Sequence, residues 1–511
     1  PMAPDGAPAP VTSRPRRRAG TGPPSGTPVY TAPVGRLRAG ALTGIWTSIA
    51  LTVALGALGP SVLAPTLPGS SPVPLGPGLP PYPAIALAAA AILTGGAGLA
   101  LGLRALRAGW TPGGRWPLPA GAAVVAVVAL LPPIGSADHL NYAAYGRLLA
   151  LGYDPYLTTP AELPHDPVAG AVEEWRTVPS VYGPVATAVH GLAGALGDGS
   201  VRRTVLLLAL VNAAAFLATA LLLHRCTRGD PARRGRAALL WTLNPLMIYH
   251  LAAGMHVDTL AVACMVAALA LGTGRPVRSG ALLGLGVAVK VNAGLVALGP
   301  AWELRRCPRR LAVVTAAAVA ACGLAYLWAG PHALDRVSAA SRAVSLATPW
   351  HLVKSGLQAV FGPGGYRVWI QLGALALLAV LAVLLARALR EPYRLAGPGA
   401  APGVAVCLVT AWLLATPYAL PWYDGLVFAL LALVGGTALD GFLVARLTVL
   451  SLGYLPAREA GRPAELDWLV EAVRARAVPW ALLALTAALA WWAYRAGARA
   501  RTRPRSAVPL P

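Results

Sequence analysis

Apolar runs long enough to cross a lipid bilayer recur along the chain, and they constrain its fold more than any other feature. One membrane-spanning helix needs roughly 17–25 predominantly apolar residues, at about 1.5 Å per residue. The candidate spans are about 41–65, 83–104, 117–135, 204–223, 237–252, 257–273, 311–330, 366–389, 402–419, 421–438, 441–455 and 478–497, with an ambiguous stretch at 280–303. This pattern predicts an all-α, polytopic transmembrane helical bundle of about 12–14 spans, with interfacial helices on its external side.

The composition excludes a soluble globular protein and argues against nucleic-acid binding. Only 12% of the 511 residues are charged and 56% are hydrophobic, whereas soluble domains carry about 25% charged residues. The net charge of +23 comes almost entirely from arginine. Its clusters lie between the apolar runs instead of covering one face, which is typical of membrane topology.

The arginine clusters also predict which loops face the cytoplasm, because cytoplasmic loops carry an excess of Lys and Arg. Both ends of the chain are basic, so residues 1–38 are predicted to be a disordered cytoplasmic tail and residues 498–511 a second cytoplasmic tail. Between the tails, residues 39–497 form the membrane domain. Three spans precede residues 136–203, which we therefore expect to be the main external loop, with 181–197 lying at the membrane interface.

The ambiguous stretch 280–303 has arginines on both flanks, at Arg275 and at Arg305–Arg310. A single crossing would leave the second cluster outside, so we favour a re-entrant helical pair that bends near Lys290–Asn292. The lysine of this bend either extends to a membrane interface or needs a buried anion. Asp258 or a lipid phosphate would supply that anion.

Polar and aromatic groups are expected to converge on the external side, at the mouth of the bundle, where membrane proteins place binding sites. They come from SADHLNY, VYGP, AAGMHVD and PYALPWY, and include Asp138, Tyr182, His256, Asp258, Trp422 and Tyr423. Each has a simpler interpretation. Asp138 would serve equally as the N-cap of a helix that starts at His139. The aromatic residues would form an interfacial belt, and AAGMHVD a helix start with an acidic first turn.

A set of ordered motifs over residues 117–440 favours the functional interpretation. DHLNYAAYGRLLALGYDPY, EEWRTVPSVYGPVATAVHGL, NPLMIYHLAAGMHVDTLAVA, GLGVAVKVNAGLVALGP and ATPYALPWY follow one another. Together they resemble the polyprenol-phosphomannose-dependent α-1,6-mannosyltransferases of lipomannan synthesis, which have the GT-C architecture. The resemblance implies that Asp138 is the catalytic base. The family's Gly-His-Asn-Asp corner appears here as Gly254-Met255-His256-Val257-Asp258, without its Asn.

The resemblance implies a membrane glycosyltransferase on the external face of the cytoplasmic membrane. Its donor would be a polyprenyl-phosphate-mannose, its acceptor a lipid-linked mannan, and its product an α-1,6 linkage formed with inversion. One carboxylate base and cations for the phosphate suffice for this reaction. Candidates for binding donor and acceptor are His139, Tyr142, Arg147, Asp154, Tyr156, Tyr182, His256, Asp258, Lys290, His351, Lys354, Trp422 and Tyr423.

Two other functions stay open at this point. An arabinofuranosyltransferase that uses polyprenyl-phospho-arabinose would need the same features, and a lipid transporter or flippase would also carry buried charges. No internal repeat and no GxxxxGK[ST] motif supports a transporter. We expect no cofactor and no metal, because no His/carboxylate cluster has metal-ligand spacing.

Overall fold

The computed structural model describes residues 32–502, apart from residues 70, 72, 113–115 and 341–342. The predicted N-terminal tail falls mostly on residues 1–31, outside the described part. Helix α1 already begins at Ala32 and the last helix, α19, continues to Thr502. Both predicted tail boundaries therefore overlap with helix.

Every regular element in the described residues is helical, and none is a strand, so the predicted all-α class is confirmed. Six helical segments of the described chain are long and apolar enough to span a membrane. They are α1 (Ala32–Ala57), α2 (Pro81–Arg107), α6 (Val201–Cys226), α12 (Pro308–Ala329), α15 (Arg367–Ala388) and the stretch that ends in α19 (Val478–Thr502). Shorter apolar helices are α3 (Pro117–Leu130), α9 (Asp258–Leu271), α10 (Pro276–Val289) and α16 (Ala401–Ala415). The protein is a helical membrane protein; the number of crossings stays a prediction.

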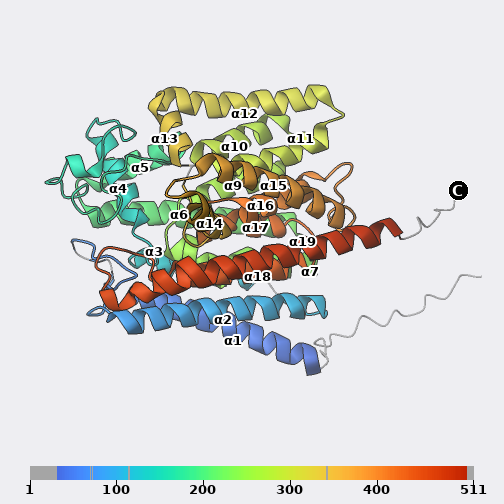
Figure 1. Ribbon diagram of the computed structural model, residues 1–511, viewed down its shortest axis with the longest axis horizontal. Helices are drawn as coiled ribbons and strands as arrows, with labels where there is room; N and C mark the ends of the chain where they lie inside the picture. Colours follow the sequence, from blue (N-terminus) through green and yellow to red (C-terminus); the bar gives the residue numbers. More distant parts are fainter. Residues whose placement is uncertain (1–31, 70, 72, 113–115, 341–342, 503–511) are drawn as a thin grey trace, which may run out of the picture.

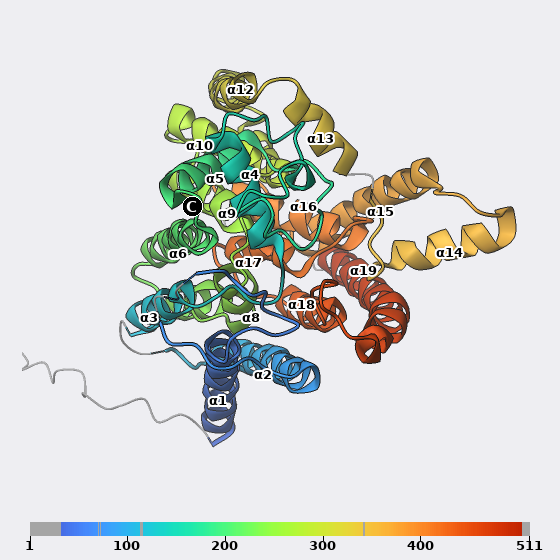
Figure 2. The same cartoon turned by 90° about the vertical axis from the view of Figure 1, so that its left-hand side faces the viewer.

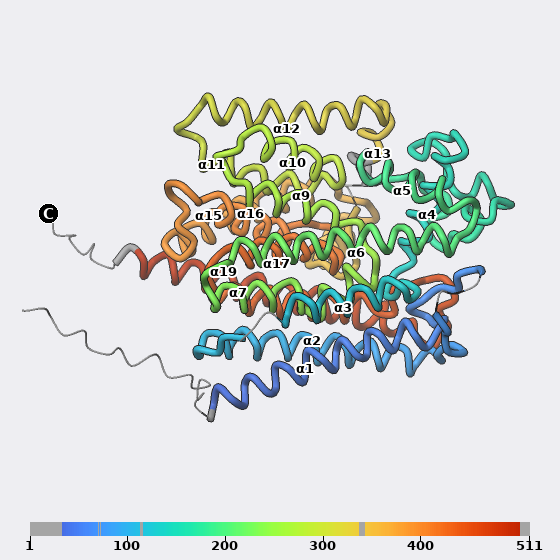
Figure 3. Tube along the Cα trace, turned by 180° about the vertical axis from the view of Figure 1, so that it is seen from behind, coloured from blue at the N-terminus to red at the C-terminus, as the bar shows by residue number. Residues whose placement is uncertain are grey.

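The long helices run side by side along the longest axis of the molecule, with α1 and α2 at one edge and α12 at the opposite edge (Figures 1 and 3). Small residues allow the closest contacts. A Cβ at Gly44 would lie 2.8 Å from the carbonyl oxygen of Thr94 and 2.9 Å from the Cα of Gly98. The two helices can approach this closely only because glycines face each other, which is a common way to pack membrane helices.

One predicted span is not a single helix. Residues 231–253 form α7 (Pro231–Ala237), a π-helical stretch, α8 (Pro245–Met247) and a second π-helical stretch. The break is at Asn244, whose Oδ1 accepts hydrogen bonds from the backbone N–H groups of Leu246 (3.1 Å) and Met247 (3.3 Å). Pro245 has no N–H to donate and disfavours helix at the residue before it. The candidate span at 237–252 is therefore a broken helix, and whether it crosses the membrane stays a prediction.

The bend predicted near Lys290 is present. Helix α10 ends at Val289, Lys290 has an extended backbone, and a 3₁₀ turn leads into α11 (Leu298–Leu304). The hydroxyl of Thr273 donates to Glu303 Oε1 at 3.0 Å. The segments on both sides of the bend therefore return to the same end of the bundle, as expected of a helical pair.

Residues 136–203, which we predicted to be the main external loop, lie at one end of the molecule, around α4 (Asp138–Ala150) and α5 (Pro184–Gly197) (Figure 1). This loop is linked to the segment that follows residue 454. Arg458 forms an ion pair with Glu173, and the backbone N–H of Glu459 donates to Glu174 Oε1 at 2.5 Å. The start of α1 and the end of α19 lie at the opposite end (Figure 1).

The remaining helices complete the bundle and its rim. They are α13 (His332–Ala340), α14 (Pro349–Phe361), α17 (Asp424–Leu431) and α18 (Leu439–Tyr454). Figure 2, viewed from the end that carries the loops, shows α13 between α12 and α15, while α14 extends away from the bundle.

Candidate active site

A cavity of about 630 Å³ lies at the end of the bundle where the loops gather. Aromatic side chains form much of its wall: Tyr145, Trp175, Tyr182, Trp412, Tyr418, Trp422, Tyr423 and Tyr454. Its polar lining includes Asp138, Asn141, Lys290, Asn292, Arg336, Gln371 and Thr416. A third group, Ala374, Leu375 and Leu378 of α15, is apolar. The volume and the mixture of aromatic, charged and aliphatic walls are those of a small-molecule site.

Asp138 is the first residue of α4 and faces this cavity. It is not the N-cap, because Ala137 holds that position without a side-chain cap, and the N–H of Asp138 itself donates to Ser136 Oγ at 3.0 Å. The carboxylate keeps 19% exposure, and its Oδ2 lies 3.6 Å from His256 Nδ1. Burial raises the pKa of Asp138 to about 6, although the nearby Lys290 ammonium opposes the shift. The carboxylate is thus more basic than an ordinary aspartate and still ionised near neutral pH.

His256 lies directly behind the carboxylate and is held by two aromatic residues. Its ring stacks on Trp422 with a centroid separation of 3.5 Å and an interplanar angle of 12°. Its Nδ1 is also 3.5 Å from the hydroxyl of Tyr142, which in turn packs edge-on against Tyr182 at 5.0 Å. The His256 imidazole thereby connects α4 to the PWY corner (Pro421–Tyr423) and fixes their spacing around Asp138.

Lys290 and Asp258 form a buried ion pair beside the cavity. The ammonium donates to both carboxylate oxygens of Asp258, at 2.7 and 2.6 Å, and lies 4.3 Å from the centroid of the Tyr423 ring. The lysine therefore does not extend to a membrane interface; it meets the anion that its position in an apolar segment requires. Asp258 is also the first residue of α9, so the predicted acidic first turn and the pairing with Lys290 coexist.

The VYGP loop closes the cavity against the bend after α10. The N–H of Gly183 donates to the carbonyl oxygen of Val289 at 3.2 Å, and a Cβ at this glycine would collide with the backbone of Ala288. Only glycine allows this approach. The contact places Tyr182 on the cavity wall next to Lys290.

The remaining predicted site residues lie elsewhere. His139 is the second residue of α4 and is fully buried, and Arg147 forms an ion pair with Asp166 at 2.8 Å. Asp154 accepts from the N–H of Tyr156 at 2.8 Å, while the Tyr156 hydroxyl donates to the carbonyl oxygen of Tyr182 at 3.1 Å. His351 and Lys354 lie on the protruding α14 (Figure 2). None of these side chains lines the cavity; Tyr156 supports it from behind.

Comparison with known proteins identifies the family. Residues 41–306, a little more than half of the chain, match the family described as "Alpha-(1->6)-mannopyranosyltransferase, N-terminal domain". The chain belongs to this family. The resemblance inferred from the ordered motifs is thereby confirmed at the level of the family.

Two relatives of the same name support the assignment. The chain is 34% identical over 179 residues to α-(1→6)-mannopyranosyltransferase A of Mycobacterium tuberculosis, covering 34% of this chain and 33% of the relative. It is 32% identical over 157 residues to α-(1→6)-mannopyranosyltransferase B of Corynebacterium glutamicum, covering 29% and 25%. The chain therefore aligns with only a quarter to a third of the length of these relatives. No solved structure matches it.

The family match includes part of the cavity only. Asp138, Tyr182, His256 and Lys290 fall within residues 41–306. The PWY corner and Arg336 follow in the sequence and complete the cavity from outside that range.

Several lining residues were not predicted from the sequence. Arg336, Gln371, Tyr418 and Tyr454 belong to segments that hydropathy assigns to loops or span ends. The amphipathic pattern of HALDRVSAA was the one available signal for Arg336, because it indicates a short surface helix. Among the residues that the structure describes, no three His, Cys, Asp or Glu side chains gather in a way that would hold a metal ion.

Proposed function

We propose that this protein transfers mannose from a polyprenyl-phosphate-mannose donor to a lipid-linked mannan acceptor, forming an α-1,6 linkage with inversion. The proposal places the cavity on the external face of the cytoplasmic membrane and both chain ends in the cytoplasm. Family membership supports the mannosyl reaction, and the apolar helices support a donor that resides in the lipid bilayer.

The observation that carries the proposal is the environment of Asp138. In a chain of this family, a carboxylate with a pKa near 6 lies on the wall of a cavity of about 630 Å³. A general base works best when its pKa is close to the operating pH. This carboxylate is ionised at neutral pH and remains basic enough to accept a proton in the transition state.

The reaction needs a single displacement. An acceptor hydroxyl attacks the anomeric carbon of the donor while Asp138 takes the hydroxyl proton. The bond between that carbon and the phosphate oxygen breaks, and its electron pair leaves with the lipid phosphate. Because the phosphate is a good leaving group without protonation, one carboxylate is sufficient.

The cavity walls suit two parts of such a donor, the sugar and the prenyl chain. Aromatic faces, among them Tyr182 and Trp422, would stack on sugar rings. The aliphatic surface of Leu375 and Leu378 on α15 would contact the prenyl chain. His256, stacked on Trp422, would hold Asp138 in place as a positioning residue.

The direct test is sugar transfer in membranes that contain the protein. Membranes are supplied with labelled mannosyl-phosphopolyprenol or arabinosyl-phosphopolyprenol, and the labelled glycolipids are separated and counted. We expect label only from the mannosyl donor, and transfer about 10²–10⁴-fold slower with the Asp138→Asn variant. Transfer of arabinose instead of mannose would reject the donor sugar; no transfer of either sugar by a well-folded protein would reject the enzyme.

A further inference from the structure

The cavity contains two cationic side chains among its described lining residues, Lys290 and Arg336. They differ in what they contact. Lys290 donates to both oxygens of the Asp258 carboxylate, so the charge of this pair is already balanced. The guanidinium of Arg336 contacts no carboxylate of the described chain; its Nε donates to the backbone carbonyl oxygen of Tyr156 at 3.0 Å.

The other cationic side chains that were predicted to bind the phosphate are either paired with a carboxylate or lie outside the cavity. Arg147 is paired with Asp166 at 2.8 Å, and Lys354 lies on α14, outside the cavity lining. Asp138 itself adds a negative charge to the wall. A ligand that carries a phosphate would therefore have one uncompensated cation to meet in the described cavity, and it is Arg336.

The position of Arg336 is fixed by the external loop. The Tyr156 carbonyl that binds its Nε belongs to the residue whose hydroxyl donates to the backbone of Tyr182, at 3.1 Å. Arg336 and Tyr182 are thus linked through one residue, and both line the cavity. Figure 2 shows the helix that carries Arg336, α13, between α12 and α15, the helix that supplies the aliphatic wall.

The chemistry of the guanidinium suits a phosphate at this point. Arginine has five N–H donors, and the Tyr156 carbonyl uses only the one on Nε. The two terminal nitrogens can donate to two oxygens of one phosphate, a geometry that lysine cannot offer. An arginine that is positioned before the ligand arrives is also suited to charge that develops during a reaction.

We infer that Arg336 binds the phosphate of a prenyl-phosphate ligand, while Lys290 keeps the site folded through Asp258. This inference rests on the proposed function. Cleavage of the donor converts a phosphodiester with one negative charge into a phosphomonoester with up to two, and the bond electrons stay on the phosphate oxygen. Arg336 therefore stabilises the leaving group more strongly as the bond breaks.

Binding of two probes to the purified full chain tests the inference. Farnesyl phosphate and farnesol share the same prenyl chain, and only the first carries a phosphate. We expect wild-type protein to bind farnesyl phosphate more tightly, measured by isothermal titration calorimetry. Arg336→Gln should weaken that binding about 10- to 100-fold, as expected when charged hydrogen bonds are lost, and leave farnesol binding unchanged.

Matched variants identify the cause. Arg203 is exposed in the first turn of α6, which begins shortly after α5 ends, so Arg203→Gln changes net charge equally and should preserve phosphate binding. Arg336→Met keeps the aliphatic stem and should match Arg336→Gln. Arg336→Lys should recover only part of the affinity. Thermal unfolding of each variant checks that the fold is retained.

Two results would overturn different claims. If Arg336→Gln and Arg336→Met bind farnesyl phosphate as tightly as wild type does, the assignment of Arg336 is wrong and the proposed function stands. If wild-type protein binds farnesol and farnesyl phosphate equally, the cavity has no phosphate site. The prenyl-phosphate donor of the proposed function then fails as well.

Discussion

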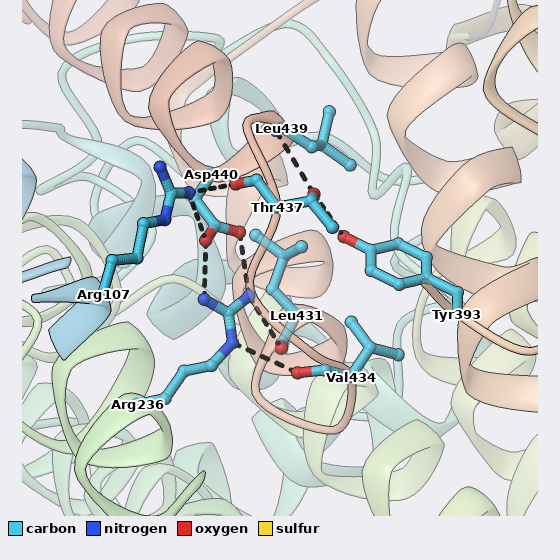
Figure 4. A network of polar contacts seen from close by, with 8 residues as sticks. All are labelled: Arg107, Arg236, Tyr393, Leu431, Val434, Thr437, Leu439 and Asp440. Atoms are coloured by element: carbon cyan, nitrogen blue, oxygen red, sulfur yellow. Dashed lines mark hydrogen bonds and ion pairs between the residues drawn. The ribbon is translucent and has the colours of Figure 1, made fainter. Parts of the chain in front are cut away.

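Both ends of the helix bundle contain buried charged side chains. Only at the cavity end can a ligand reach them. At the end opposite the cavity, Arg236 donates to both oxygens of Asp440, at 2.6 and 2.8 Å, and Arg107 adds a bond of 3.1 Å (Figure 4). The other donors of Arg236 reach the carbonyl oxygens of Val434 (3.1 Å) and Leu431 (3.3 Å). Each of these groups has its partner within the protein.

The cavity end is organised differently. Asp138 approaches His256 at 3.6 Å and opens onto about 630 Å³ of space, and Arg336 is held by a backbone carbonyl alone. Buried charge by itself therefore does not indicate a binding site. A closed cluster such as that of Asp440 ties the loop between α17 and α18 to α7, whereas an open one retains unused hydrogen-bonding capacity for a ligand.

The largest effect that we expect is a difference in thiol labelling between the two sides of the membrane. The exposed Cys226 is the last residue of α6, and the exposed Cys307 directly precedes α12. These two helix ends lie at the end of the bundle opposite α4 and α5 (Figure 1). In intact spheroplasts, a membrane-impermeant thiol reagent should leave them unlabelled and should label a cysteine introduced at Thr159. Permeabilised membranes provide the control, since Cys226 and Cys307 should then react. Labelling of the native cysteines in intact spheroplasts would reverse the topology.

The next prediction concerns Asp138, the carboxylate that faces the cavity. Asp138→Asn keeps the shape of the side chain but removes the base, and loss of a general base typically lowers the rate about 10²–10⁴-fold. Mannosyl transfer should fall on that scale, while the thermal unfolding temperature stays close to that of wild type. Transfer at a near wild-type rate by a well-expressed variant would mean that another group removes the proton.

The closed cluster should respond in the opposite way. Asp440→Asn leaves the Arg236 guanidinium buried without its carboxylate, and breaking a buried pair costs about 3–5 kcal/mol. Unfolding in detergent should occur at a clearly lower temperature, and the protein that remains folded should transfer mannose at a normal rate. A variant of normal stability that has lost activity would contradict the distinction between the two ends.

The sequence specifies the helices well because the apolar runs are local features. It also predicts the bend at Lys290, since arginines flank that stretch on both sides. It fails at residues 231–253, where Asn244 and Pro245 interrupt an apolar run that hydropathy counts as continuous. Hydropathy registers composition, whereas the break depends on one missing N–H and one capping side chain.

The cavity is predictable in part for a similar reason. Asp138, Tyr182 and Trp422 occupy loop positions that topology assigns to one end, so their proximity follows from counting spans. Arg336 and Tyr454 reach the cavity through the packing of α13 and α18 against the loops. That packing depends on contacts between distant segments, which no local pattern encodes.

A smaller effect should appear in the pH dependence of transfer. The proposed base must be ionised, and its pKa is about 6. The value of kcat/KM should therefore decline as the pH falls through about 6, by roughly tenfold for each further unit. The nearby Glu174 carboxylate contributes to the raised pKa, so Glu174→Gln should move this decline to lower pH. A profile that is flat from pH 7.5 to 5 would exclude Asp138 as the base.

The smallest effects should distinguish cavity aromatics from surface aromatics. Tyr182 and Tyr423 line the cavity, whereas Trp491 is 60% exposed on α19. A stacking contact contributes about 0.5–1.5 kcal/mol, so alanine at either tyrosine should raise the KM for the donor about 2- to 12-fold. Trp422→Ala should also lower kcat, because its ring holds His256 behind Asp138.

Trp491→Ala is the matched control for these variants, because an aromatic residue that only contacts lipid should not affect the KM for the donor. Initial rates over a range of mannosyl-phosphopolyprenol concentrations separate the two parameters. Equal KM values for the tyrosine variants, the Trp491 variant and wild type would mean that the aromatic wall shapes the cavity without binding the sugar. Stacking would then no longer distinguish the open end of the bundle from its closed end.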